Sequence, residues 1–252
     1  MRAAMNATGA SGTTPTDAVR SSIAVRSSIS ATVENYLAAL DGLTGGPPVP
    51  ALRHPLGFTC LPLLRGPVGI CVHVWTAATT ATRLTTSPFH CHSWELYSLV
   101  LDGAVHNQCL ELADSTTDEA YRIFEIHSTA VVDEIRATAD LVSVRTGEMW
   151  VNGTRDFYHL RSGVFHRTVV PGGEACTLVI GLSRPGGADR SLGPPDLGSH
   201  QRRRRYCDPA ETVWLARGAA RHLRNASGEG LVEQLSATAA GAYVTISAEG
   251  EM

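Results

Sequence analysis

The chain has 252 residues, with 21 basic and 24 acidic side chains and a formal net charge of −3 at pH 7. This near-neutral balance provides no basic field for nucleic acid or for an anionic membrane surface, so neither partner is expected. Hydrophobic content of 43% and charged content of 18% are typical of a globular protein with a sizeable core. No apolar run approaches the roughly 18 residues of a membrane span, and the N-terminus lacks the apolar segment of a secretory signal. The sequence therefore predicts a cytoplasmic protein.

The N-terminal part is expected to be loosely organised. Residues 1–30 are rich in Ala, Ser and Thr, which predicts a flexible arm with little apolar surface to bury. Residues 31–49 are expected to form a helix and a linker, because apolar side chains recur at helical spacing at Val33, Leu37 and Leu40. A Gly-Gly-Pro-Pro stretch then ends the helix.

The middle of the chain has the pattern of an all-β domain. Between residues 50 and 185, short apolar stretches alternate with Gly and Pro, which favours an antiparallel sandwich or barrel over alternating βα units. Residues 186–252 are expected to form a linker and a C-terminal helical segment. Its first helix is predicted to begin after an Asp208 N-cap and to reach Leu223. The tail from Leu231 fits either a helix or a helix and a strand.

Two histidines one residue apart are the strongest chemical signal. His90 and His92 stand at the start of an apolar run that reads as a strand. Residues i and i+2 of a strand point to the same face, so both imidazoles can grip one metal ion. A third ligand is expected at His166, which follows a tight turn at Ser162-Gly163 in a second predicted hairpin.

These residues resemble the cupin superfamily. Its first motif has the form G-x5-H-x-H-x3,4-E-x6-G, which His90, His92 and Gly103 match in type and spacing. Its second motif has the form G-x5-P-x-G-x2-H-x3-N, which Gly163 and His166 match. The chain departs from the motifs at Leu84, Arg155, Arg161 and Val170. The resemblance implies a double-stranded β-helix, or jelly-roll barrel, over residues 50–185 with helical appendages at both ends. The departures favour a specialised member, as in secondary metabolism.

The glutamate of the first motif is displaced. The family spacing puts it at Leu96, whereas Glu95 is one residue early. Pleat parity then points Glu95 away from His90 and His92 unless a bulge intervenes, and both arrangements stay open. Without the glutamate, the site resembles the three-histidine thiol dioxygenases of the superfamily, of the cysteine dioxygenase kind. That resemblance implies Fe(II), although imidazole ligands also suit Ni, Zn, Mn and Cu.

The resemblance implies a mononuclear non-haem Fe(II) dioxygenase that acts on a small polar substrate, such as an amino acid or a thiol, together with O₂. Tyr158 and Glu95 are the candidates to steer protons. Two alternatives stay open. One is a lyase, isomerase or cyclase that uses the metal as a Lewis acid, and the other is a ligand-binding cupin without catalysis. A homodimer is also among the options.

Four residues are candidates to contact the substrate. Arg122 and Arg161 can each pair with a carboxylate through two hydrogen bonds. His106 follows the first predicted strand and can line the mouth of the pocket. Tyr97 competes with Tyr158 for the cavity, because it has the opposite parity from Leu96. Each candidate has an ordinary alternative as a surface arginine, a wall histidine or a core tyrosine.

Other conspicuous residues receive structural interpretations. His73 and His159 alternate within strand patterns and are expected to be hydrogen-bonded wall residues. The run from Arg202 to Arg205 is interpreted as a solvated loop, with a phosphate or partner patch as the alternative. Six cysteines without a C-x-x-C pair are expected to be reduced and mostly packed as small apolar side chains, at positions 60, 71, 91, 109, 176 and 207.

Overall fold

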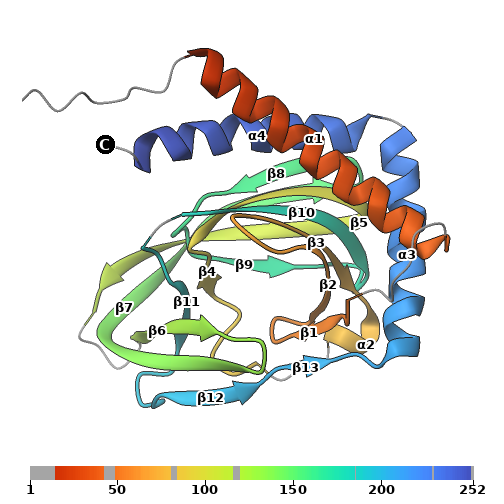
Figure 1. Cartoon of the computed structure of the whole chain (residues 1–252). Helices are drawn as coiled ribbons and strands as arrows, with labels where there is room; N and C mark the ends of the chain where they lie inside the picture. The colour runs from red at the N-terminus through yellow and green to blue at the C-terminus, as the bar shows by residue number, and fades with distance from the viewer. Residues whose placement is uncertain are drawn as a thin grey trace, which may run out of the picture.

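The computed structural model describes residues 15–42, 49–80, 84–115, 120–184, 186–228 and 230–250. The described chain is rich in β-structure and has helices at both ends (Figure 1). Four helices are present in these ranges: α1 (Pro15–Leu40), α2 (Ala77–Thr80), α3 (Pro209–Gly228) and α4 (Leu231–Gly250). The strands are β1 (Leu52–His54), β2 (Phe58–Leu64), β3 (Val68–Trp75), β4 (His90–Cys91), β5 (Trp94–Asp114), β6 (Tyr121–Ser128), β7 (Val132–Gly153), β8 (Phe157–Leu160), β9 (His166–Val169), β10 (Ala175–Ser183), β11 (Asp189–Gly193), β12 (His200–Arg203) and β13 (Arg205–Tyr206).

The strands form two antiparallel sheets that share the long strand β5. The first sheet has the order β13-β1-β2-β3-β10-β5-β8, and the second has the order β12-β7-β6-β11-β4-β9-β5. The strand passes from one sheet to the other at Gly103, which has a φ of 78°. A Cβ there would lie 2.6 Å from the carbonyl oxygen of Glu174, so both the backbone conformation and the space demand glycine.

Six strands of the second sheet close into a ring. β5 pairs with β7 along one edge and with β9 along the other, and the ring runs on through β4, β11 and β6. Most residues between the two histidine motifs lie in three strands of this ring, the long strands β5 and β7 and the strand β6 between them. This β-rich architecture agrees with the expected fold class at that level, and the jelly-roll winding stays a prediction.

Helices α1, α3 and α4 cover the outer face of the first sheet (Figure 1). α1 packs against α4, and Ile29 and Val33 of α1 are fully buried in the main hydrophobic core. The expected flexible arm over residues 1–30 is therefore wrong for residues 15–30, which are helical. Apolar residues every three or four positions continue from Val25 through Ile29 to Val33, and burial of this stripe against α4 stabilises the helix. Residues 1–14 of the arm lie outside the described residues.

The described chain is helical from Pro209 onward, whereas the linker expected from residue 186 instead contains β11, β12 and β13, which join the two sheets. α3 begins as predicted, because the side chain of Asp208 accepts a hydrogen bond of 2.8 Å from the backbone N–H of Glu211. The tail from Leu231, which fits either a helix or a helix and a strand by its sequence, is the single helix α4. None of the described helices has the length and apolar content to cross a membrane. The arginine run is not a loop as expected, because Arg202 and Arg203 lie in β12 and Arg205 lies in β13, at the edges of the two sheets.

Candidate metal centre

The structure brings together the three histidines singled out in the sequence. His90 in β4 and His166 in β9 are direct register partners, and His92 follows β4 by one residue. The ring centroid of His90 lies 4.3 Å from the ring centroid of His166 and 5.0 Å from the ring centroid of His92. One nitrogen from each ring lies within 4.8 Å of the other two. The three side chains thus converge on one point.

Backbone hydrogen bonds orient two of the three rings. Nδ1 of His90 lies 3.0 Å from the carbonyl oxygen of Pro88, and Nδ1 of His166 lies 3.0 Å from that of Val164. A carbonyl oxygen only accepts hydrogen bonds, so Nδ1 carries the proton and Nε2 presents its lone pair. Such hydrogen bonds fix the tautomer of metal-ligating histidines. The donor set therefore fits a divalent metal ion.

The environment keeps these imidazoles neutral. Burial, with a further contribution from His92, lowers the pKa of His90 to about 3. Burial, with a contribution from His90, lowers the pKa of His166 to about 3 as well. The pKa of His92 is lowered well below its ordinary value by burial and by the positive charge that His166 would carry. Near pH 7 all three lone pairs are free, as metal ligation requires.

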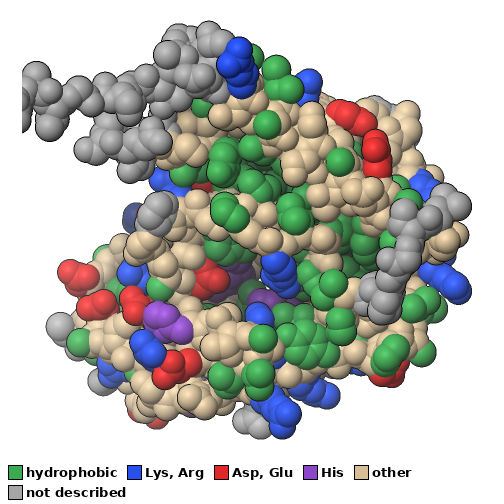
Figure 2. Space-filling view, viewed as in Figure 1, with side chains coloured by type: hydrophobic (Ala, Val, Ile, Leu, Met, Phe, Trp, Pro, Cys, Tyr) green, Lys and Arg blue, Asp and Glu red, His purple; other side chains and the backbone are tan. Residues whose placement is uncertain are grey.

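A cavity of about 740 Å³ extends from the three histidines between the two sheets. Figure 2 shows this face hollowed at its middle, with histidine side chains inside the hollow. Leu96, Tyr158 and Leu160 all line the cavity. Tyr158 and Leu160 share a face of β8, as their parity in the sequence predicts. Burial raises the pKa of Tyr158, so its phenol stays protonated near neutral pH.

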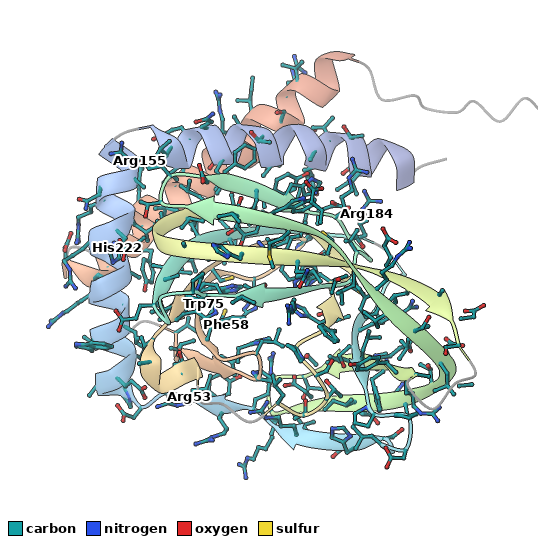
Figure 3. All side chains as sticks on the ribbon, turned by 180° about the vertical axis from the view of Figure 1, so that it is seen from behind. Arg53, Phe58, Trp75, Arg155, Arg184 and His222 are labelled. Atoms are coloured by element: carbon teal, nitrogen blue, oxygen red, sulfur yellow. The ribbon has the colours of Figure 1, made fainter. Side chains whose placement is uncertain are left out.

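Glu95 lies on the other face of β5 and does not reach the histidine cluster. The register of β5 against β10 is regular at Glu95, so no bulge turns the side chain inward. The buried carboxylate accepts a hydrogen bond from Nε2 of His159 at 2.5 Å and from the backbone N–H of Ser162 at 3.3 Å. It also pairs at 2.7 Å with Nε of Arg184, which follows β10 (Figure 3). The structure thus favours the outward alternative and gives Glu95 no contact with the cavity.

The four expected substrate contacts lie elsewhere, since none of them lines the described cavity. Tyr97 is buried on the outer face of β5 and stacks on His159, with ring centroids 4.3 Å apart. Arg122 donates hydrogen bonds to the carbonyl oxygens of Pro195 and Thr138. Its guanidinium is therefore already used in holding the second sheet together. Two further candidates, Arg161 and His106, are also outside the cavity.

Sequence reasoning missed the basic side chains that do line the cavity. Arg202 and Arg204 both face it from the segment of β12 and β13. Nε of Arg204 lies 3.0 Å from Oδ1 of Asp133, in a largely buried ion pair. Nη1 of Arg202 is buried and has no hydrogen-bond partner among the described residues. Strand parity could place Arg202 and Arg204 on one face, but it could not show that this face borders the cavity.

Comparisons with known proteins give little information about the family or function of this chain. A scan against family models and a search of curated proteins both gave no match. Among solved structures, the crystal structure of FeII HppE matches with 15% sequence identity and a TM-score of 0.31. The match covers 56% of this chain and 60% of that one, so less than two thirds of the HppE chain is spanned. This similarity is too weak to define a shared fold. The described structure and site define a β-rich protein with a three-histidine group suited to a divalent metal.

Proposed function

We propose that this chain is a cupin-type metalloenzyme in which His90, His92 and His166 hold one Fe(II) ion. The observation that carries the proposal is the convergence of three neutral imidazoles at one end of an internal cavity. Three nitrogen ligands leave positions on a divalent metal for other molecules, and the nearby carboxylate of Glu95 is turned away. Ni, Zn, Mn and Cu are competitors for the same ligands.

The reaction proposed is dioxygenation of a small polar substrate, an amino acid or a thiol. When bound, Fe(II) would supply Lewis acidity and redox chemistry with O₂. Apolar side chains of the first sheet that line the cavity, including Leu96, Leu160 and Val179, would exclude water from the reacting atoms. The phenol of Tyr158 would donate a hydrogen bond to the substrate and hold its proton.

A carboxylate on the substrate would be recognised by Arg202. Its buried Nη1 lacks a hydrogen-bond partner in the described structure, and a guanidinium binds a carboxylate with favourable planar geometry. Burial lowers the pKa of Arg202, and the nearby Asp133 opposes this shift by favouring the charged form. Arg202 therefore takes the role that the sequence suggested for Arg122 or Arg161.

The proposal is tested by oxygen uptake. Protein purified without oxygen and reloaded with Fe(II) is given cysteine, cysteamine or 3-mercaptopropionate, with O₂ followed by an electrode. Consumption of one O₂ per substrate oxidised is expected, with preference for the two probes that carry a carboxylate. Conversion of a substrate without O₂ consumption would instead indicate a lyase or isomerase. No metal binding at the three histidines would exclude the proposed site.

A further inference from the structure

A second group of metal-ligating side chains lies in the same cavity. Cys60 in β2 and Cys71 and His73 in β3 each offer one ligand atom within 4.8 Å of the other two. Sγ of Cys71 lies 3.2 Å from Nε2 of His73. Cys60 is the register partner of His73, and Cys71 precedes His73 by two residues. All three side chains therefore project from one face of the first sheet, and all three line the cavity.

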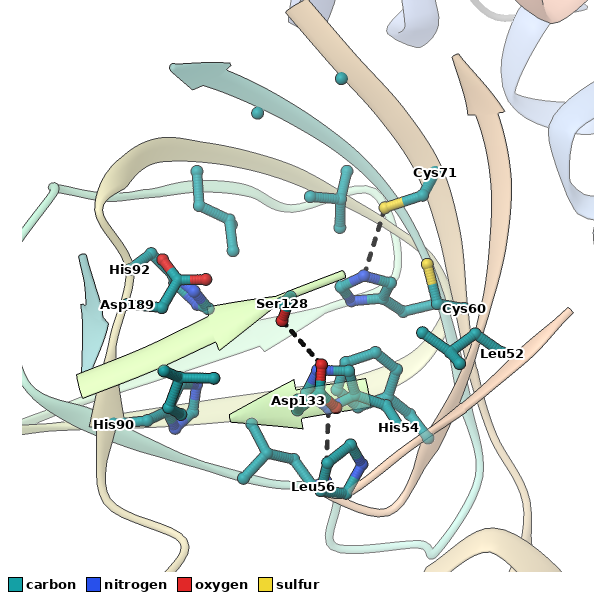
Figure 4. Close-up of a pocket in the computed structure, with 18 of the residues that line it drawn as sticks. Leu52, His54, Leu56, Cys60, Cys71, His90, His92, Ser128, Asp133 and Asp189 are labelled. Atoms are coloured by element: carbon teal, nitrogen blue, oxygen red, sulfur yellow. Dashed lines mark hydrogen bonds between the residues drawn. The ribbon is translucent and has the colours of Figure 1, made fainter. Parts of the chain in front are cut away.

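This group is separate from the three histidines. Cys60, Cys71 and His73 come from the first sheet, whereas His90 and His166 come from the second. Figure 4 shows the two groups at opposite sides of the pocket, with Cys60 and Cys71 on β2 and β3 and with His90 and His92 across from them.

The surroundings favour a thiolate in this group. The hydrogen bond from Cys71, and after it the nearby His73, lower the pKa of Cys60 well below its ordinary value, although burial opposes the shift. The pKa of Cys71 is raised by the same contact with Cys60 and by burial. A metal ion would be held by the deprotonated sulfurs.

Aromatic rings pack beside the group. Phe58 packs on His73 with ring centroids 4.2 Å apart, and Trp75 lies 5.2 Å from Phe58 (Figure 3). His73 and Trp75 also meet edge to face at 5.8 Å. An apolar surrounding of this kind strengthens thiolate–metal attraction and orients the ligating imidazole.

We propose that Cys60, Cys71 and His73 form a second metal site, for a thiophilic d¹⁰ cation such as Zn²⁺ or Cu⁺. Two sulfurs and one imidazole nitrogen are a preferred donor set for these ions. In a tetrahedral zinc site a sulfur and a nitrogen ligand lie about 3.6 Å apart, close to the separation of Cys71 and His73. The fourth position would face the cavity. This inference does not depend on a metal at the three histidines.

A disulfide between Cys60 and Cys71 fits the backbone less well. The two residues are diagonal neighbours on β2 and β3, because Cys60 pairs with His73 while Cys71 pairs with Pro62. Diagonal Cα atoms in an antiparallel pair lie about 7–8 Å apart. Disulfides seldom bridge more than about 7 Å, so closing one would require the strands to move.

The test is a titration of the reduced, metal-free full chain with Co²⁺. Thiolate ligation produces an intense sulfur-to-cobalt charge-transfer absorption, whereas a site made only of imidazoles does not. The band is expected in the wild-type protein and is expected to be lost in Cys60→Ala and Cys71→Ala. Cys207→Ala is the matched control, because Cys207 is buried outside the cavity and should leave the band unchanged. His92→Ala should retain the band while losing a separate equivalent of cobalt.

A second measurement needs no variant. Wild-type protein is alkylated with and without Zn²⁺, or with Cu⁺ in a parallel arm, and the modified cysteines are located by mass spectrometry. We expect the metal to protect only Cys60 and Cys71 from alkylation. The ion that protects them at the lower concentration is the preferred metal. Absence of the cobalt band in wild-type protein would overturn the proposal. So would equal alkylation with and without metal, or a mass about 2 Da lower that locates a Cys60–Cys71 disulfide in freshly purified protein.

Discussion

Glu95 and His159 hold the two histidine motifs together from outside the cavity, with Oε2 of Glu95 2.5 Å from Nε2 of His159. The other carboxylate oxygen accepts a hydrogen bond from the backbone N–H of Ser162, in the turn before His166. The same turn donates the N–H of Gly163 to the carbonyl oxygen of His92 at 2.8 Å. Glu95 therefore contacts both β8 and the turn before His166, although its carboxylate does not reach the histidine cluster.

Replacing Glu95 separates a positioning role from a ligating one. We expect Glu95→Gln to keep nearly full metal content, because the carboxylate does not face the histidine cluster. The free energy of unfolding should fall by about 1–3 kcal/mol, since a buried carboxylate that accepts several hydrogen bonds is lost. Metal analysis and urea unfolding of the same sample measure both effects.

Glu111→Gln is the control for that change. Glu111 pairs with Arg145 on an exposed part of β5, so its replacement should alter stability by less than about 1 kcal/mol. A loss of metal from Glu95→Gln as large as that from His92→Ala would show that the carboxylate ligates the metal after all.

Packing of α1 is tested by two isoleucines on the same helix. Ile29 is fully buried against the core, whereas Ile23 is 52% exposed. Ile29→Ala should cost about 2–5 kcal/mol of unfolding free energy, because it removes apolar contacts and leaves a cavity. Ile23→Ala should cost less than about 1 kcal/mol. Urea unfolding compares them, and equal effects would mean that α1 does not dock as described.

The metal-free protein should be less stable at pH 5 than at pH 7. His90 and His166 have a pKa of about 3 in the folded chain, but an ordinary value near 6.5 when unfolded. Between these values the unfolded chain binds more protons, so stability is lost as the pH falls. Each histidine contributes about 2 kcal/mol to the difference. Burial of His54 and His92 acts in the same direction.

Urea unfolding in the presence of a chelator measures this pH dependence. His166→Gln removes one of the titrating groups and should reduce the difference between pH 5 and pH 7. Unfolding free energy that is flat across this range, or higher at pH 5, would contradict the buried neutral histidines.

Substrate recognition is tested with two arginines. Arg202→Gln should weaken binding of cysteine to the metal-loaded protein by roughly 10- to 100-fold, as expected for loss of a charged hydrogen-bond donor. Arg161→Gln, at an exposed position outside the cavity, should have little effect. Calorimetric titration under nitrogen compares the variants. A larger loss of cysteine binding in Arg161→Gln than in Arg202→Gln would show that Arg161 contacts the carboxylate.

The sequence predicted the parts of the site that depend on strand parity. Alternation placed His90 and His92 on one face, and it put Glu95 on the opposite face only if the strand is regular; the structure has the regular arrangement. It could not predict the substrate contacts, because parity does not tell which strands border a cavity. Arg122 forms hydrogen bonds within the second sheet, while Arg202 reaches the cavity from a strand that was interpreted as a loop.

Two further differences have the same origin in tertiary packing. The Ser- and Ala-rich start of α1 has weak local signals, and its helix is stabilised through burial of Ile29 against α4. The sequence predicts Cys60 and Cys71 as small packed side chains and His73 as a hydrogen-bonded wall residue. Only the pairing of β2 with β3 brings them together.

The central claim is that His90, His92 and His166 hold one divalent metal ion, and iron stoichiometry after anaerobic Fe(II) loading tests it most directly. His222→Ala is the control, because His222 lies on α3, outside the cavity and away from both histidine motifs. About one iron per chain is expected for the wild-type protein and for His222→Ala, and close to none for His166→Ala. Full iron content in a folded His166→Ala variant would contradict the three-histidine site.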